Sequence, residues 1–291
     1  MITHKLAIFI LCLSPVVCFS QPDELPPGSY KLNINTEFRP SVPYPSIQNY
    51  NQDLTRQGTG REFTVGVSRH HIIPFNRLRS FYNRVVENNR LRNINSFFTV
   101  YSNNLASYAS SGGVDCNRLG NDLIDASNLA LAQGSGWIRG GGDRFTSGFD
   151  TFEQFYAWLP GNLFIGPNGT SRSDDPDEEF ESNAAVVVGN ENFELLSRLN
   201  RNMRRYVEED DGSVLNGISA DLSRLAQRRS VYPLQAQDWE YVNGKYRLKR
   251  GGKESLIGVD NSYDDYLESA CDDLRPTFDK IKRKYTVVIS N

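Results

Sequence analysis

Apolar residues recur at helical spacing in several parts of the chain. After Pro74, the residues Phe75, Leu78 and Phe81 are three positions apart, which places them on one face of a helix. A proline directly before such a pattern is well placed to open the helix. Similar stripes predict further helices over residues 116–133, 152–159, 191–211, 214–229 and 263–274, while 93–108 fits either a helix or a strand.

Strand-like patterns are shorter. Residues 62–67 lead directly into two adjacent histidines, and residues 161–167 form a short apolar run closed by a turn. The clearest pattern is at 239–248, where Asn243-Gly244 lies between two alternating runs and predicts a β-hairpin with a type I′ turn. A terminal strand is expected at 285–289. Helices and antiparallel strands together predict an α+β fold.

The composition divides the 291 residues into four regions. We expect a signal peptide over 1–20 and an extended arm, rich in proline and asparagine, over 21–60. A domain containing the histidines is expected over 61–185. A helical C-terminal region, which includes the hairpin at 239–248, is expected over 186–291.

The first twenty residues have the features of a secretory signal. The apolar run from Leu6 to Val17 is too short to span a bilayer, and Cys18 and Ser20 provide small residues at a cleavage site before Gln21. No later stretch approaches transmembrane length. We therefore expect a secreted, extracellular protein that does not enter a membrane.

Secretion changes the expected chemistry of the cysteines and of one asparagine. Cys116 and Cys271 would be the two cysteines left after cleavage, and in an oxidising compartment they would most simply form one disulfide. Asn168 begins the sequence Asn-Gly-Thr, an acceptor for N-glycosylation.

The charge pattern is informative only locally. The net charge of −3 indicates no general commitment to nucleic acid or to anionic membranes. Between Arg69 and Arg92, however, six arginines accompany a single acidic residue, Glu87. Such a face is either simply solvated or able to hold a polyanion.

His70 and His71 are the candidates for chemistry. The chain has three histidines, and the remaining one, His4, lies in the expected signal. Two imidazoles can supply a metal ligand and a neutral base near pH 7. The alternative is a strand end whose histidines only pack or form hydrogen bonds. Neighbouring strand residues point to opposite faces, so the two rings share a site only where the backbone bends.

Six acidic side chains fall within the eight positions 174–181. One interpretation is helix capping, with Asp175 as the cap and Pro176 as the first helical residue. The other is that the carboxylates of Asp174, Asp175 or Glu178 bind a metal ion.

The stretches Arg69-His70-His71-Ile72-Ile73-Pro74, Asn162-Leu163-Phe164-Ile165-Gly166-Pro167 and Arg172-Ser173-Asp174-Asp175-Pro176 resemble the His-Me finger (HNH-type) nucleases, particularly their bacterial toxin versions. The resemblance covers about 35 to 40 residues. It implies a ββα core that grips one divalent cation, here with a large insertion between the histidines and Asn162.

The resemblance also implies roles for individual residues. His71 would be the base that activates water, and Asn162 would brace the loop carrying that base. Hydrolysis of a phosphodiester also needs cationic side chains nearby, which Arg69, Arg77 or Arg79 could supply. His70 would bind the metal. No histidine follows position 71, so Asp174, Asp175 or Glu178 would have to replace the family's last ligand. Mg²⁺ prefers oxygen ligands, whereas a mixture of imidazole and carboxylate also admits Zn²⁺ or Mn²⁺.

Two functions of different classes remain open. The first is metal-dependent hydrolysis of phosphodiesters in extracellular nucleic acid. The second is a non-catalytic extracellular matrix or interaction protein, whose acidic segments at 174–181 and 264–273 would bind matrix components, Ca²⁺ or mineral. The missing histidine favours the second function, and the Arg-His-His-x-x-Pro stretch favours the first.

Overall fold

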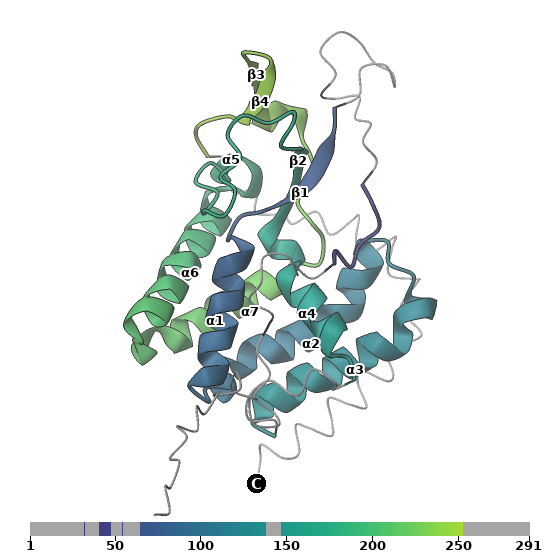
Figure 1. The fold of residues 1–291 in the computed structure, drawn as a ribbon, viewed down its shortest axis with the longest axis vertical. Helices are drawn as coiled ribbons and strands as arrows, with labels where there is room; N and C mark the ends of the chain where they lie inside the picture. Colours follow the sequence, from purple (N-terminus) through teal and green to yellow (C-terminus); the bar gives the residue numbers. More distant parts are fainter. Residues whose placement is uncertain (1–31, 33–40, 48–53, 55–64, 138–146, 253–291) are drawn as a thin grey trace, which may run out of the picture.

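The computed structural model describes residue 32, residues 41–47, residue 54, and residues 65–137 and 147–252 (Figure 1). The expected signal peptide, the helix at 263–274 and the strand at 285–289 lie outside these residues. Most of the expected arm at 21–60 also lies outside them.

Helices dominate the described residues, and two small antiparallel sheets accompany them. The helices are α1 (Phe75–Glu87), α2 (Asn95–Ser111), α3 (Cys116–Ser135), α4 (Phe149–Ala157), α5 (Ala185–Val188), α6 (Asn190–Glu209) and α7 (Leu215–Ala226), with short 3₁₀ turns at Leu91–Ile94, Pro160–Asn162, Gly212–Val214 and Ala236–Asp238. The strands are β1 (Val67–His71), β2 (Leu163–Pro167), β3 (Trp239–Val242) and β4 (Lys245–Leu248). The fold is therefore α+β.

The β1–β2 pair is formed by segments far apart in the sequence. The two strands are antiparallel, with His70 opposite Phe164 and His71 opposite Leu163. Helices α1 to α4 all lie between them in the chain, so β1 and β2 are not a simple hairpin. These helices therefore lie in the chain between the histidines and Asn162.

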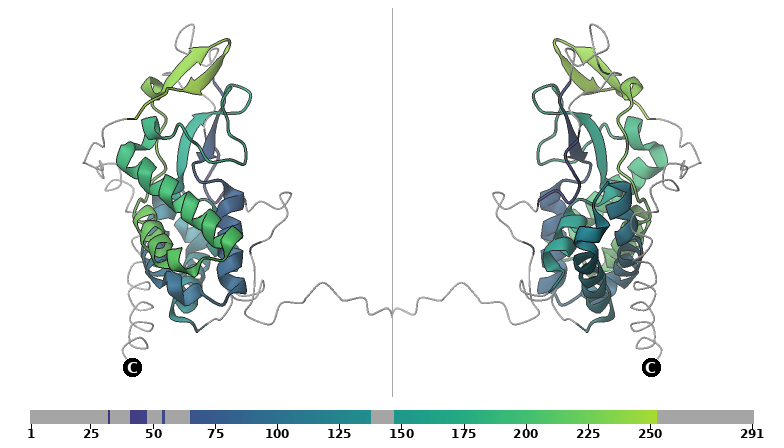
Figure 2. Two further views of the ribbon diagram at one scale, coloured as in Figure 1. Left: turned by 90° about the vertical axis from the view of Figure 1, so that its left-hand side faces the viewer. Right: turned by 90° about the vertical axis from the view of Figure 1, so that its right-hand side faces the viewer.

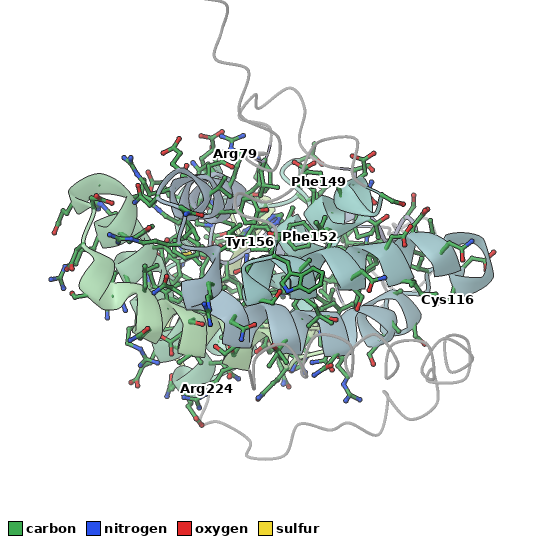
Figure 3. The ribbon with its side chains drawn as sticks, turned by 90° about the horizontal axis from the view of Figure 1, so that it is seen from below. Arg79, Cys116, Phe149, Phe152, Tyr156 and Arg224 are labelled. Carbon is green, nitrogen blue, oxygen red and sulfur yellow. The ribbon has the colours of Figure 1, made fainter. Side chains whose placement is uncertain are left out.

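A single apolar cluster holds the helices together, with aromatic side chains at its centre. Phe152 and Tyr156 on α4 are fully or almost fully buried, and their rings stack 6.0 Å apart. Figure 3 shows both in the middle of the helices, with Cys116 and Arg224 at the periphery. The cluster includes Leu199 of α6 and Leu222 of α7, so the helices that follow residue 185 pack on those that precede it.

The β3–β4 hairpin lies at one end of the molecule. Trp239 pairs with Leu248 and Val242 with Lys245, and the turn between the strands is Asn243-Gly244, with φ of 51° and 88°. These positive φ values are those of the type I′ turn predicted from the sequence. In Figure 2 the β1–β2 pair lies between this hairpin and the helices.

Along the described residues, no helix combines the length and the apolar character needed to cross a bilayer.

Candidate functional site

Strand β1 presents its two histidines on opposite faces. Ser68 Oγ lies 3.0 Å from His70 Nε2, which places these two side chains on the same face, as the two-residue repeat of a strand requires. The His71 ring instead packs against the Trp158 ring, at 4.7 Å between centroids. Both histidines nevertheless border one pocket, described below.

Asn162 holds the chain immediately after the histidines. Its side chain is completely buried. Its Oδ1 accepts from Ile73 N at 2.8 Å, its Nδ2 donates to Ile73 O at 2.8 Å, and its backbone oxygen accepts from Ile72 N at 3.0 Å. The structure thus brings Asn162 and the histidine pair together, and the amide holds the backbone that follows His71. The catalytic part of its implied role stays a prediction.

His71 is partly exposed, and one of its ring nitrogens has a defined partner. Nε2 lies 2.8 Å from the carbonyl oxygen of Ala157. A carbonyl oxygen can only accept, so Nε2 carries a proton. In the neutral ring, Nδ1 then holds the lone pair and is the basic atom.

His70 is buried, and both of its nitrogens have neighbours. Nε2 donates to Pro167 O at 2.8 Å, while Nδ1 lies 3.3 Å from Arg172 Nη1 and 3.3 Å from Asp175 Oδ2. The ring also stacks on Phe164, its partner across the strands. A metal ligand at His70 would have to use Nδ1 and displace these neighbours, so this role stays a prediction.

Arg172 has a central place that the sequence analysis did not assign. Its side chain is fully buried and forms ion pairs with Asp174, at 2.8 Å between Nε and Oδ1, and with Glu181. Burial alone would lower the pKa of Arg172, but the Glu181 and Asp174 carboxylates together raise it, so the guanidinium stays charged. The one available signal was an arginine followed at short spacing by carboxylates.

The acidic segment contains no helix at Pro176, and the capping interpretation is wrong. Asp177 adopts a left-handed φ of 53°, which is incompatible with a right-handed helix starting at Pro176. The next helix begins only at Ala185. Asp175 Oδ1 instead accepts from Asp177 N at 3.3 Å in a local turn.

The three predicted carboxylate ligands have different surroundings. Asp174 is held by Arg172 and by Leu248 N, whose distance to Oδ2 is 3.0 Å. Asp175 lies beside His70, and the hydrogen bond from His70 is the main reason its pKa is lowered. Glu178 lies 3.4 Å from the side-chain nitrogen of Asn76.

Arg69 is directed toward the N-terminal segment. It donates to Pro45 O at 3.0 Å, and its guanidinium carbon lies 5.2 Å from the centre of the Tyr44 ring. Burial lowers the pKa of Arg69. Arg69 borders the pocket, but these contacts hold its charged end on Tyr44 and Pro45.

These residues surround a pocket of about 600 Å³. It is lined by Ser68, Arg69, His70, His71, Phe75, Asn76, Arg79, Asp175, Pro176, Asp177 and Glu178. Asn162 and Asp174 are not among the lining residues. Within the described ranges, no three His, Cys, Asp or Glu side chains form a group arranged to hold a metal ion.

Neither of the two predicted covalent sites is among the residues that line this pocket. Cys116 is buried at the first position of α3, and its predicted partner Cys271 lies outside the described residues, so the disulfide stays a prediction. Asn168 is partly exposed in the turn after β2, and its Oδ1 accepts from Thr170 Oγ1 at 2.7 Å.

Comparisons with known proteins give one relative. Over 155 residues, the chain is 35% identical to "Putative protein p9" of Acyrthosiphon pisum secondary endosymbiont phage 1. The aligned region is 50% of this chain and 41% of the phage protein, so the chain spans about two fifths of that relative. No protein-family model matches the chain. No solved structure matches it.

Proposed function

We propose that the pocket hydrolyses phosphodiester bonds with the help of a divalent cation, and that His71 is its general base. The carrying observation is the hydrogen bond from His71 Nε2 to Ala157 O. It fixes the tautomer in which Nδ1 can accept a proton from water near pH 7. The resemblance to His-Me finger nucleases supports the same assignment, with β1, β2 and a following helix as the core.

Rigid support around His71 favours this role. Trp158 packs on the ring, and Asn162 fixes the backbone of Ile73, two residues further along. A base held in one orientation loses less freedom when it reacts than a mobile one does. Two arginines border the pocket. Arg79 is buried, with its guanidinium carbon 5.3 Å from the centre of the Phe75 ring, and Arg69 would have to leave Pro45 to reach a phosphate.

The carboxylates that line the pocket fit Mg²⁺ or Mn²⁺ better than Zn²⁺. Zinc sites use three or four protein ligands, and the part of the chain that the structure describes has no such group. Magnesium is commonly held by one or two carboxylates together with water and substrate phosphate. Asp175 and Glu178 would supply these carboxylates. When bound, the cation would neutralise charge on the scissile phosphate.

The test is cleavage of plasmid DNA and of RNA by the purified protein, with Mg²⁺, with Mn²⁺ and with chelator. His71→Ala should lose on the order of a hundredfold or more in rate, which is the usual effect of removing a positioned base. Arg201→Ala is the control, because Arg201 is exposed on α6 and its side chain bonds to Ser197 of the same helix. Equal cleavage by wild type and His71→Ala would refute the assignment.

A second candidate is a non-catalytic extracellular protein that binds Ca²⁺ or matrix components. The observation that favours it is the acidic wall, where Asp175, Asp177 and Glu178 border the pocket together. It predicts no cleavage with any metal, and calorimetric binding of Ca²⁺ that Asp175→Asn weakens. For both candidates we propose secretion, supported by the signal-like first twenty residues.

A further inference from the structure

A buried arginine lies where three segments of the fold meet. The guanidinium carbon of Arg172 is 5.7 Å from the ring centre of Phe164 on β2 and 5.3 Å from that of Trp239 on β3. Its third neighbour is His70 on β1, at 3.3 Å between Nη1 and Nδ1. A buried charge is costly unless it is paired, and Asp174 and Glu181 provide that pairing.

The backbone on both sides of Arg172 is fixed to the β3–β4 hairpin. Ser173 N donates to Tyr246 O at 2.9 Å, and Tyr246 N donates to Ser171 O at 2.8 Å. Leu248 N donates to Asp174 Oδ2 at 3.0 Å. Since the hairpin holds the residues before and after Arg172, the guanidinium has little freedom to move away from His70.

The protonation of the His70 ring nitrogens decides which atom donates in the contact between His70 and Arg172. Nε2 donates its proton to Pro167 O, so Nδ1 of the neutral ring can only accept, whereas Nδ1 of the charged ring donates to Asp175 Oδ2, which also lies 3.3 Å away. Arg172 Nη1 can only donate, and it lies at the distance of a weak hydrogen bond. Arg172 therefore complements the ring orientation that Phe164 stacking and Pro167 already favour.

We infer that Arg172 is a positioning residue of the pocket, because it fixes the His70 ring on β1. Since the β3–β4 hairpin holds the backbone around Arg172, the hairpin also contributes to the position of His70. The inference deepens the proposed function and rests on it for its catalytic consequence. The geometric part stands without it. Arg172 touches no substrate and acts through His70 and the neighbouring carboxylates.

The experiment reads the imidazole ¹⁵N chemical shifts of the full chain at one fixed pH, with signals assigned from His70→Gln and His71→Gln. Arg172→Met removes the donor and keeps much of the side-chain volume, so the His70 Nδ1 signal should move and the His71 signals should not. Arg198→Met is the control: Arg198 is another arginine held by an ion pair, with two nitrogens 2.8 and 2.6 Å from the oxygens of Asp221, and neither residue borders the pocket. It should move neither histidine.

Two further measurements keep the inference open to refutation if Arg172→Met does not fold. Trp239→Leu leaves the arginine and removes one of its ring neighbours, and it should also move the His70 signal. In wild type, the guanidinium protons of Arg172 should show nuclear Overhauser effects to the His70 ring. Unmoved His70 signals in a folded variant, or no such effect in wild type, would overturn the inference.

A kinetic arm separates this inference from the proposed function. In folded Arg172→Lys, kcat for plasmid cleavage should fall about tenfold or more while KM changes little, because a misplaced group slows the chemical step. Unchanged kcat would overturn the catalytic consequence. If wild type cleaves nothing, the proposed function fails, and the ¹⁵N shifts still decide whether Arg172 positions His70.

Discussion

At the scale of single residues, the pocket depends on buried polar groups that lie next to the reactive ones. Asn162 and Arg172 are both fully buried, and neither contributes an atom to the pocket lining. Each instead satisfies the polar groups of residues beside the histidines. Removing one of them leaves a buried partner without its hydrogen bonds, which costs more than losing an exposed contact.

Asn162→Ala should lower the free energy of unfolding by about 2–6 kcal/mol, because it leaves the buried N–H and C=O of Ile73 unpaired, at about 1–3 kcal/mol each. Asn76→Ala is the control. Its side chain is exposed enough to reach water, and its contacts to Glu178 are long, at 3.4 Å, so the cost should stay within about 0.5 kcal/mol. Urea denaturation measures both. Equal costs would show that the Asn162 amide does not brace the site.

Asp175 should make the stability depend on pH in the acid range. Its pKa is lowered in the folded state, first by the hydrogen bond from His70. The stabilising contribution is therefore complete above the unfolded pKa, about 3.9, and is lost as the pH falls through the lower, folded value. Melting temperatures recorded from pH 6 down to pH 2 should fall less steeply below about pH 4 in Asp175→Asn than in wild type. Parallel curves would contradict the contact.

At the scale of elements, local patterns in the sequence predicted the helices and the hairpin. Phe75, Leu78 and Phe81 all became buried on α1, and Asn243-Gly244 formed the expected turn. Residues 93–108 fitted either state because β-branched and aromatic residues are common there; packing on α3 and α7 accompanies the helical outcome. The helix expected at Pro176 failed because Asp175 bonds to Asp177 within a turn.

The site was harder to predict than the elements. His70, His71 and Asn162 were grouped through the family resemblance, since no local pattern links segments about ninety residues apart. Arg172 was missed because its role depends on Phe164, Trp239 and Glu181, which come from three separate segments. Periodicity reports which face of an element is buried, but it does not report which buried faces meet.

Replacing each of two glycines by alanine should change the stability in opposite directions, which tests the assigned turn and the assigned helix. Gly244 has φ of +88° in the hairpin turn, so Gly244→Ala should destabilise by about 1 kcal/mol or more. Gly217 lies on the exposed side of α7, where an added Cβ meets nothing nearer than 3.9 Å. Gly217→Ala should therefore stabilise by up to about 1 kcal/mol. Urea midpoints measure both, and a shift of the same sign in both would contradict the assigned turn or helix.

At the scale of the whole molecule, short pieces of the N-terminal region are held against the domain at widely separated points. The Asn83 side chain bonds both backbone groups of Leu32, at 2.7 and 3.0 Å. Tyr44 OH donates to Trp158 O at 2.9 Å, next to the ring that packs on His71. Tyr246 OH donates to Leu54 O. The pocket, the helices and the hairpin are thus each tied to residues that precede β1.

Tyr44 is the contact through which this N-terminal region should affect both stability and the pocket. Its ring is buried against Phe155, at 5.7 Å between centroids, and the Arg69 guanidinium lies over the same ring. Tyr44→Phe removes the hydroxyl bond to Trp158 and should cost about 1 kcal/mol. Tyr44→Ala also removes the buried ring and should cost about 3–5 kcal/mol. It should also free Arg69 from its ring partner, so limited chemical modification of arginines, read by mass spectrometry, should label Arg69 faster in Tyr44→Ala than in Tyr44→Phe. Equal labelling, with the expected stability losses, would show that Pro45 alone holds Arg69 in place.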